Sequence, residues 1–525
     1  MILYIYIALF YLALASALRH DVQMFQQNSY RANRYFRWLK GGILSFANLK
    51  LYLVLFSVGA FVCFSSVELT DGYMLLLAVG FACFAYFELR KKFKVKLVIT
   101  SRVKRLLVTS LLLSTVGFGV AYTSLEFNVF IGVSSLIVVF SNVIVLLADL
   151  INKPIEKAIT GWYINDARKI IASRKDLIVI GITGSYGKTS TKNYLYRMLT
   201  EKYNVLVTPG NYNTLLGVVR TIREQLRPQH QIFIVEMGAK QRGDIREICD
   251  LVNPTIGIVT SVGEAHLETF KSVENIQKTK FELIDSLPKH GYGVVNFDSK
   301  SIKQYDYKSA CPIVGYSIDE PTANIKAQDV SYDSKGVSFS LNIGNEQLNF
   351  HSPLLGGGNV LNIAAGVVVA SNLGVSAKEL QRAIQQLQPV EHRLSMSRAG
   401  GLTILDDAYN SNPTGAKMAL DVLRDFTRVQ GASRVIITPG FVEMGANQAE
   451  ANYTFGCQIA ASVDYAVIVN RLNREAIVKG LDDMGFGVEN YFVADTLNQA
   501  RAHLASRLKA GDVILYENDL PDSFK

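Results

Sequence analysis

Apolar residues are concentrated in the first 150 positions of the chain, where they form five long runs. Each run is close to the roughly 20 residues that a helix needs to cross a bilayer. The first run lacks the basic start of a cleaved signal peptide, so we expect it to remain as a span. The pattern predicts an α-helical membrane region of five spans within residues 1–150, over Met1–Leu18, Phe46–Val67, Gly72–Leu89, Leu106–Thr123 and Asn128–Ala148.

The charged residues between the runs predict the orientation of this region. The second and fourth connections carry only Glu68, Asp71 and Glu126. The first and third connections are rich in Lys and Arg, which mark cytoplasmic loops. Five spans then place the N-terminus outside and the chain after Leu150 in the cytoplasm. The basic residues are Arg19, Arg31, Arg34, Arg37 and Lys40, and then Arg90, Lys91, Lys92, Lys94, Lys96, Arg102, Lys104 and Arg105.

Beyond residue 150 the pattern changes to an alternation of short β-branched runs and amphipathic stretches, which is typical of an α/β fold with a parallel sheet. Residues 151–176 are mixed and charged and predict a linker helix. We expect a central domain over residues 177–388, with a β-rich insertion at 312–353. Residues 389–525 again alternate strands with helices and predict a smaller, Rossmann-like domain.

Composition narrows the possible classes of protein. Hydrophobic residues make up 49% and charged residues 19% of the 525 positions, which excludes a disordered chain. Five cysteines without a CxxC exclude a disulfide scaffold. Residues 1–150 carry 14 Lys/Arg but only 6 Asp/Glu, so nearly all of the formal charge of +9 lies beside the membrane region. The positive charge of the chain therefore does not indicate a nucleic-acid partner, and none is expected.

The strongest chemical signal is the segment Gly181-Ile-Thr-Gly-Ser-Tyr-Gly-Lys-Thr-Ser190, in which a predicted strand enters a glycine-rich turn that opens a helix. Such a turn cradles phosphate with backbone N–H groups, and the helix N-terminus adds positive potential. Lys188 is expected to neutralise the terminal phosphates of a nucleotide, and the Thr189 hydroxyl to coordinate Mg²⁺. The strict Walker spacing would need glycine at 182, where this chain has Ile. The residues of this predicted ATP-binding turn are Gly184, Ser185, Gly187, Lys188, Thr189 and Ser190.

Three motifs in order resemble the Mur ligases, which are ATP-dependent amide-bond ligases of bacterial cell-wall precursor synthesis. They are the phosphate turn, Pro209-Gly-Asn-Tyr-Asn213 and Val235-Glu-Met-Gly-Ala239. The resemblance covers about residues 177–515 and is strongest to the branch that adds D-alanyl-D-alanine to UDP-N-acetylmuramoyl-tripeptide. It implies ATP and Mg²⁺ as cofactors and an acyl-phosphate route to the amide bond. With the five spans, it implies a multi-pass protein of the bacterial cytoplasmic (inner) membrane.

The resemblance also implies roles for a set of metal-binding and catalytic residues. Glu236 ends an apolar strand, where open α/β sheets bind ligands, and the family makes it a magnesium ligand. His266 matches the family's second-metal histidine, and Lys280 matches a lysine that CO₂ carbamylates into a magnesium-binding anion. Without the resemblance, each of these has a purely structural interpretation: a solvated strand end, a structural histidine or a solvated helix face. With Lys188, these three residues form the expected catalytic set.

Further matches concern the nucleotide. Asn359 and Asn362 lie in a segment that resembles the adenine-contacting helix start, although an asparagine there can equally be an N-cap. Arg393 matches an arginine that reaches ATP from the domain junction, and Asp407 matches a nucleotide-contacting acid. On its own, the segment around Asp407 would be interpreted as an Asx-rich turn.

Five spans occupy the place where the family has a soluble UDP-binding domain, which leaves the acceptor open. The expected partners are a carboxylate-bearing cell-envelope precursor, an amino acid or dipeptide that supplies the amine, and the lipid bilayer. The alternatives are a ligase that acts on a lipid-linked surface glycan, a poly-amino-acid synthetase and, less favoured, an ATP-gated transporter or scaffold. The sequence does not predict an oligomeric state.

Overall fold

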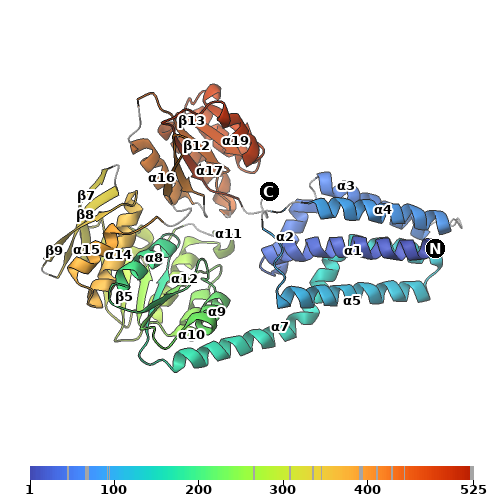
Figure 1. Cartoon of the computed structure of the whole chain (residues 1–525), viewed down its shortest axis with the longest axis horizontal. Helices are drawn as coiled ribbons and strands as arrows, with labels where there is room; N and C mark the ends of the chain where they lie inside the picture. The colour runs from blue at the N-terminus through green and yellow to red at the C-terminus, as the bar shows by residue number, and fades with distance from the viewer. Residues whose placement is uncertain are drawn as a thin grey trace. The chain divides into compact units, whose positions relative to one another are not determined.

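The protein forms two compact units in a computed structural model, over Met1–Gly161 and Trp162–Leu520 (Figure 1). The structure describes residues 1–43, 46–64, 70–91, 93, 95–263, 267–306, 309–333, 336–344, 346–389, 394–408, 412–426, 430–442 and 444–520.

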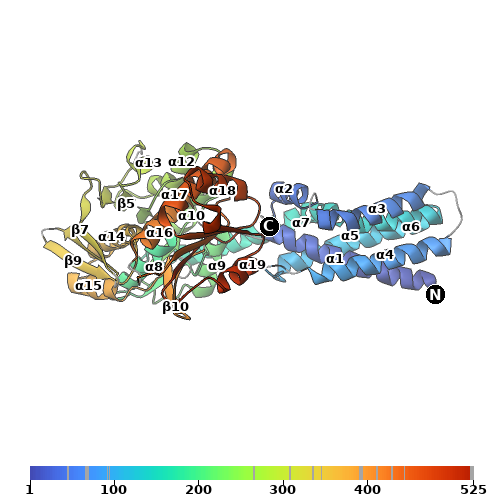
Figure 2. The ribbon, with the colours of Figure 1, turned by 90° about the horizontal axis from the view of Figure 1, so that it is seen from above.

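The first unit is a bundle of helices that run alongside one another (Figure 2). Helix α1 packs mainly against α4, and α3 packs against α6. The centre is aromatic: the rings of Phe10 and Phe118 stack 4.5 Å apart, and Phe130 meets Phe118 edge-on. The helices are α1 (Ile2–Gln27), α2 (Ala32–Ile43), α3 (Phe46–Phe64), α4 (Thr70–Arg90), α5 (Ser101–Ser124), α6 (Phe127–Val139) and α7 (Ser141–Ala172), of which α7 continues into the second unit.

Among the described residues, three helices are long and apolar enough to cross a membrane: Ile2–Gln27, Asp71–Arg90 and Ser101–Ser124. The pair α6 and α7 would add a fourth span, bent by 70° at Phe140. The predicted count of five is therefore not confirmed. The described apolar part of α3 is short, Tyr52–Phe64, and the predicted fifth run is divided between two differently directed helices.

Helix α1 is longer than the apolar run that predicted it, and its extension carries ionisable side chains into the bundle. His20 Nδ1 lies 3.1 Å from a carboxylate oxygen of Glu88 on α4, and Lys91 Nζ lies 2.5 Å from the other. Ser141 donates a hydrogen bond of 2.6 Å to the neighbouring Asp21. Mutual pairing offsets the cost of removing these groups from water.

The predicted linker helix at 151–176 is the second half of α7, which ends at Ala172. Its last turns belong to the second unit. Arg223 donates to Asp166 at 2.6 Å, and its guanidinium lies 4.3 Å from the centre of the Tyr163 ring.

The second unit begins with a sheet in the order β2-β3-β1-β4-β5-β6-β7-β8-β9. The pairs from β2 to β7 are parallel, whereas β7, β8 and β9 form an antiparallel meander. The predicted β-rich segment at 312–353 therefore extends the main sheet at one edge. The strands are β1 (Ile178–Thr183), β2 (Val205–Val207), β3 (Ile232–Glu236), β4 (Ile256–Val259), β5 (Tyr292–Asn296), β6 (Ile313–Ser317), β7 (Ile325–Asp333), β8 (Gly336–Ile343) and β9 (Glu346–Ser352).

Helices cover both faces of this sheet (Figure 1). Helices α8 and α14 pack together over one face, where Leu195 and Ile363 join Ile180 in one buried cluster. On the other face, Ile245 and Phe281 pack with the alternate strand residues. The helices are α8 (Lys188–Leu199), α9 (Leu215–Gln225), α10 (Asp244–Val252), α11 (Leu267–Phe270), α12 (Val273–Asp285), α13 (Lys300–Lys303), α14 (Gly357–Asn372) and α15 (Ala377–Gln385).

The C-terminal part contains a second sheet, in the order β10-β11-β15-β12-β13-β14. Its pairs are parallel except for β10 and β11. The strands are β10 (Ser395–Ala399), β11 (Leu402–Asp407), β12 (Arg434–Thr438), β13 (Tyr465–Val469), β14 (Tyr491–Ala494) and β15 (Val513–Glu517); the helices are α16 (Pro413–Asp425), η1 (Gly445–Asn447), α17 (Gln448–Ser462), α18 (Arg474–Asp483), η2 (Val488–Asn490) and α19 (Leu497–Ala505).

Close packing of α3 on α6 gives a stability prediction. A Cβ at Gly132 would lie 2.5 Å from the Gly59 carbonyl oxygen, whereas a Cβ at Gly119 of α5 would meet nothing within 4 Å. We expect Gly132→Leu to separate the two helices and to cost about 1–3 kcal/mol or more. Thermal unfolding of the full-length protein in detergent measures the loss, with Gly119→Leu as the matched control. Equal melting temperatures for the two variants would contradict the packing.

Candidate active site

The glycine-rich turn lies between the end of β1 and the start of α8, at the carboxyl edge of the parallel strands. Gly187 precedes α8 with φ of 79°, a left-handed conformation that favours glycine. A Cβ at Gly187 would lie 2.5 Å from Asn362 Oδ1, and a Cβ at Gly184 would lie 2.0 Å from Thr260 Oγ1. Both positions therefore exclude a side chain, which leaves backbone free to approach a ligand.

Residues that follow β4 hold the turn in place. The Ser185 hydroxyl donates to the carbonyl of Gly263 at 3.1 Å and accepts from its N–H at 3.0 Å. The Ser261 hydroxyl accepts from the N–H of Tyr186 at 2.8 Å. Lys188 folds back over the turn, where its Nζ donates to the carbonyls of Gly184 and Ser185 at 2.7 and 3.2 Å. The ammonium is thus positioned over the predicted phosphate site.

Glu236, at the end of β3, is the centre of a buried polar cluster. One carboxylate oxygen accepts from Thr189 Oγ1 at 3.2 Å and from Asn213 Nδ2 at 3.1 Å. The other lies 3.0 Å from Lys192 Nζ, and both charged side chains are about 1% exposed. Lys192 also donates to the carbonyls of Thr208 and Gly210, at 2.9 and 2.8 Å. The cluster ties α8 to β3 and to the segment after β2.

Sequence reasoning missed Lys192. It is the last residue of the motif TGSYGKTSTK and lies four positions after Lys188, so it faces the same side of α8. A lysine on the sheet-facing side of a helix, opposite a strand that ends in Glu, is the signal that would have indicated a buried ion pair.

The electrostatics of the cluster suit a cation. Burial opposes ionisation of Glu236, but the ammonium groups of Lys192 and Lys188 outweigh it and lower the pKa of this carboxyl below its usual value. Its second oxygen pairs with Lys192 without hydrogen-bond geometry and accepts no hydrogen bond from the described residues. An ionised carboxylate and a hydroxyl are oxygen donors of the kind that Mg²⁺ prefers, so Glu236 and Thr189 fit the expected ion.

Lys280 lies on the buried side of α12 and is 4% exposed. Burial, reinforced by the positive charge of Lys188, lowers the pKa of Lys280 to about 7. The neighbouring Lys278 is exposed and pairs with Glu274 at 2.5 Å. A neutral amine is the form that reacts with CO₂, so of the two lysines Lys280 has the environment that carbamylation requires.

The two asparagines at the start of α14 face α8. Asn359 accepts from Tyr194 Oη at 2.8 Å and donates to the Leu355 carbonyl at 2.7 Å. Asn362 accepts from Thr191 Oγ1 at 3.1 Å. Their side chains therefore connect α14 to the phosphate-turn helix.

Asp407 belongs to the second sheet and not to the sheet that carries Glu236. Asp407 ends β11 in the second sheet, where its carboxylate accepts from the N–H of Leu394 at 3.0 Å. His266 and Arg393 lie outside the described residues. Within the described part of the chain, no three His, Cys, Asp or Glu side chains form a metal-binding group.

Comparison with known sequences matches both parts of the second unit. The family described as "Mur ligase middle domain" matches residues 182–370, and "Mur ligase, glutamate ligase domain" matches residues 392–516. A UDP-N-acetylmuramoyl-tripeptide–D-alanyl-D-alanine ligase of Mycobacterium tuberculosis is 30% identical over 65% of this chain and 70% of its own length. The corresponding ligase of Bacillus subtilis is 31% identical over 46% of this chain and 52% of its own.

Solved structures show the same fold. The MurF ligase of Thermotoga maritima in complex with ADP has a TM-score of 0.59 and 25% identity, and covers 68% of this chain and 80% of its own. A MurF structure from Acinetobacter baumannii has a TM-score of 0.60 and 24% identity, over 67% and 76% of the two chains.

The buried pair gives a first prediction for this site. Lys192→Met leaves the Glu236 carboxylate buried beside a hydrocarbon, so we expect a loss of about 3–5 kcal/mol in the free energy of unfolding and a raised pKa of Glu236. Denaturant unfolding measures the loss in the free energy of unfolding. Lys192→Met with Glu236→Leu should recover part of the loss. Arg220→Met, which breaks an exposed pair with Glu224, should change little. A similar loss in the Arg220 variant would contradict the argument.

Lys280 gives a second prediction. Its amine binds a proton up to its ordinary pKa of 10.5 in the unfolded chain, but only to about 7 in the folded protein. The unfolded state therefore binds more protons between these values, and stability contributed at this site rises with pH across that window. The melting temperature of wild type minus that of Lys280→Met should rise from pH 7 to pH 10 in CO₂-free buffer. Lys278→Met should show no such trend. If the melting-temperature difference between wild type and Lys280→Met did not change with pH, the amine of Lys280 would titrate normally.

Proposed function

The chain belongs to the Mur ligase family and is an ATP-dependent peptide ligase of peptidoglycan precursor synthesis, similar to MurF; from that premise we propose that it works at the cytoplasmic face of the membrane. There it would join the peptide carboxylate of a cell-wall precursor to the amine of D-alanyl-D-alanine or a related donor. The observation that carries the ligase reaction is the glycine turn, with Lys188 folded over it and its positive charge acting on the buried carboxylate of Glu236.

The residues suggest how the reaction proceeds. The backbone of the turn at Gly184 and Gly187 would hold the phosphates of ATP, and Lys188 would neutralise charge on the γ-phosphoryl group. The acceptor carboxylate attacks the γ-phosphorus, and the bond to the β-phosphate oxygen breaks, which yields an acyl phosphate and ADP. The amine then attacks the acyl carbon, phosphate leaves, and the nitrogen loses a proton to give the amide.

Bound Mg²⁺ would supply charge neutralisation and orientation of the phosphate oxygens. Thr189 and Glu236 are the residues of this chain that would hold it. Lys280, as a carbamate, and His266 would hold a second ion, as the resemblance implies. Lys192 acts as a positioning residue, because it keeps Glu236 ionised and directed toward Thr189.

Membrane attachment is supported by the three long apolar helices of the first unit. We propose that the first unit spans the bilayer, with five spans if the described part of α3 and the bent pair of α6 and α7 each cross it. The basic connections would then face the cytoplasm and put the ligase domains on that side.

The acceptor has two candidate forms. The relatives' name specifies UDP-N-acetylmuramoyl-tripeptide, which is soluble. If the first unit spans the membrane, it favours instead an acceptor whose carboxylate is linked to a lipid. Addition of an amino acid to a lipid-linked glycan is the second candidate, and a poly-amino-acid synthetase the third. An ATP-gated transporter is less favoured.

The test is ADP release by the full-length protein in detergent, with UDP-N-acetylmuramoyl-tripeptide and D-alanyl-D-alanine. We expect wild type to form the pentapeptide and Lys188→Ala to lose at least on the order of 10²–10³-fold in rate, because it lacks a charge at the transferring phosphoryl group. Lys175→Ala, at an exposed lysine before β1, is the control and should retain activity.

Other outcomes separate the alternatives. No turnover with intact ATP binding would exclude the soluble acceptor and direct the search to lipid-linked carboxylates. A ladder of products would indicate a poly-amino-acid synthetase. Hydrolysis of ATP without any amide, whichever acceptor is supplied, would contradict the ligase reaction at the membrane.

A further inference from the structure

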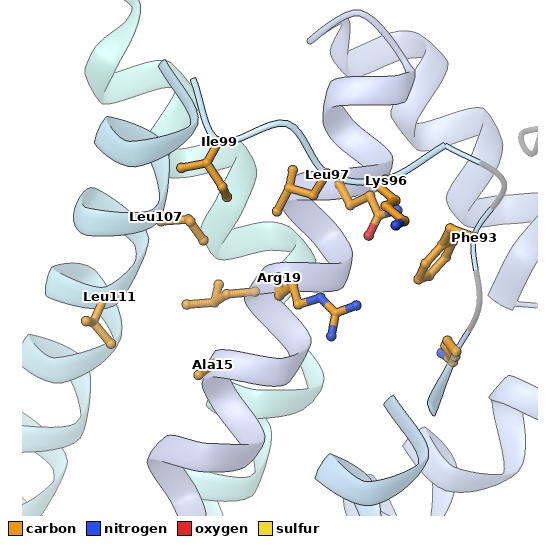
Figure 3. A pocket seen from close by; sticks show the side chains of 11 residues that line it. Ala15, Arg19, Phe93, Lys96, Leu97, Ile99, Leu107 and Leu111 are labelled. Atoms are coloured by element: carbon orange, nitrogen blue, oxygen red, sulfur yellow. The ribbon is translucent and has the colours of Figure 1, made fainter. Parts of the chain in front are cut away.

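A cavity of about 760 Å³ lies in the first unit. Its apolar wall comes from α1 and α5, through residues such as Ala15, Leu107 and Leu111. The segment between α4 and α5 closes it from another side with Phe93 and Leu97. Figure 3 shows the Arg19 guanidinium directed from α1 into the space between this apolar wall and Phe93.

Side-chain hydrogen bonds from α1 hold the backbone of Val95 and Val98, which lie between α4 and α5. Gln23 and Gln27 donate to the Val95 carbonyl at 2.8 and 3.1 Å. Gln26 donates to the Val98 carbonyl at 2.9 Å and accepts from its N–H at 3.0 Å. The backbone at Val95 and Val98 is thus paired by side chains of α1, so this border of the cavity is held by specific contacts.

The charges around the cavity have one sign. Of the residues that the structure describes, Arg19, Lys91 and Lys96 line it and no carboxylate does. Lys91 is paired with Glu88 at 2.5 Å. Arg19 and Lys96 are exposed, and among the described residues no acidic side chain lies within ion-pair distance of either. Two cations without an acidic partner, beside an apolar wall, match a molecule that has an anionic end and a hydrocarbon end.

We propose that this cavity binds a lipid whose headgroup carries a phosphate. The phosphate would lie between Arg19 and Lys96, and the first part of a hydrocarbon chain would lie on Ala15, Leu107 and Leu111. Arginine and lysine at the end of membrane helices are placed at headgroup level, where lipid phosphates are concentrated. The inference rests on the proposed membrane location of the first unit and is independent of the ligase reaction.

The binding experiment uses the full-length protein in neutral detergent, without ATP. Dioleoyl phosphatidic acid is the probe, dioleoylglycerol is the same lipid without phosphate, and glycerol 3-phosphate is the phosphate without chains. Dissociation constants are measured by native mass spectrometry. We expect phosphatidic acid to bind at least tenfold more tightly than either comparison molecule.

Variants locate the site. Arg19→Gln with Lys96→Gln should weaken phosphatidic acid binding at least tenfold. Arg34→Gln with Lys104→Gln removes the same charge from positions in the first unit that do not line the cavity, and should bind as wild type does. Ala15→Trp should weaken binding by filling the apolar end while leaving both cations in place.

Two results would overturn the proposal. Equal binding by the two double variants would show that phosphatidic acid is held by general surface charge. Binding of glycerol 3-phosphate or UDP as tight as that of phosphatidic acid would show that the cavity takes a soluble phosphate. Because no ligase step is measured, a failure here leaves the proposed reaction untouched, and an inactive ligase would leave this result standing.

Discussion

The carboxylate of Glu236 is buried at the end of β3, where desolvation opposes its ionisation. Lys192 of α8 keeps it ionised, and the same lysine donates to carbonyls of the segment after β2. One pair of charges thereby links helix α8, strand β3 and the segment after β2. The position of α8, and with it the phosphate turn and Lys188, depends on this pair. The proposed nucleotide site thus has an anionic group and a cationic one held by the fold itself.

The two units handle polar groups in apolar surroundings differently. In the second unit, the buried charges gather at the carboxyl ends of parallel strands, where a ligand can use them. In the first unit, His20 and Lys91 both lie beside the Glu88 carboxylate, and Asp21 accepts a hydrogen bond from Ser141. Arg19, one position before His20, is left on the exposed side of the same helix. Successive helix residues point about 100° apart. His20 therefore faces Glu88 inside the bundle, whereas the adjacent Arg19 is exposed and available to a ligand.

The alternation of strands and helices predicted beyond residue 150 is present in the second unit, because β-branched runs bounded by turns have few alternative structures. The strands β1, β12 and β13 are each such a run. The first unit was predicted less well. Apolar composition identifies helices but not where one bends, so the run Asn128–Ala148 did not reveal the 70° change of direction at Phe140. Likewise, the polar end of α1 lay beyond the apolar run, and its burial depends on partners from α4 and the start of α7.

The sequence by itself determined the class of chemistry, because a glycine turn with Gly187, Lys188 and Thr189 after a strand has one dominant use. It also determined that Glu236 would lie at the ligand-binding edge of the sheet, since the ends of parallel strands meet there. Only the tertiary structure decided which charges pair. Lys192 and Lys280 are both buried lysines on helices, yet Lys192 pairs with a carboxylate, whereas burial and the charge of Lys188 lower the pKa of Lys280. The difference arises because ion pairing depends on distances of a few ångströms across elements far apart in the chain.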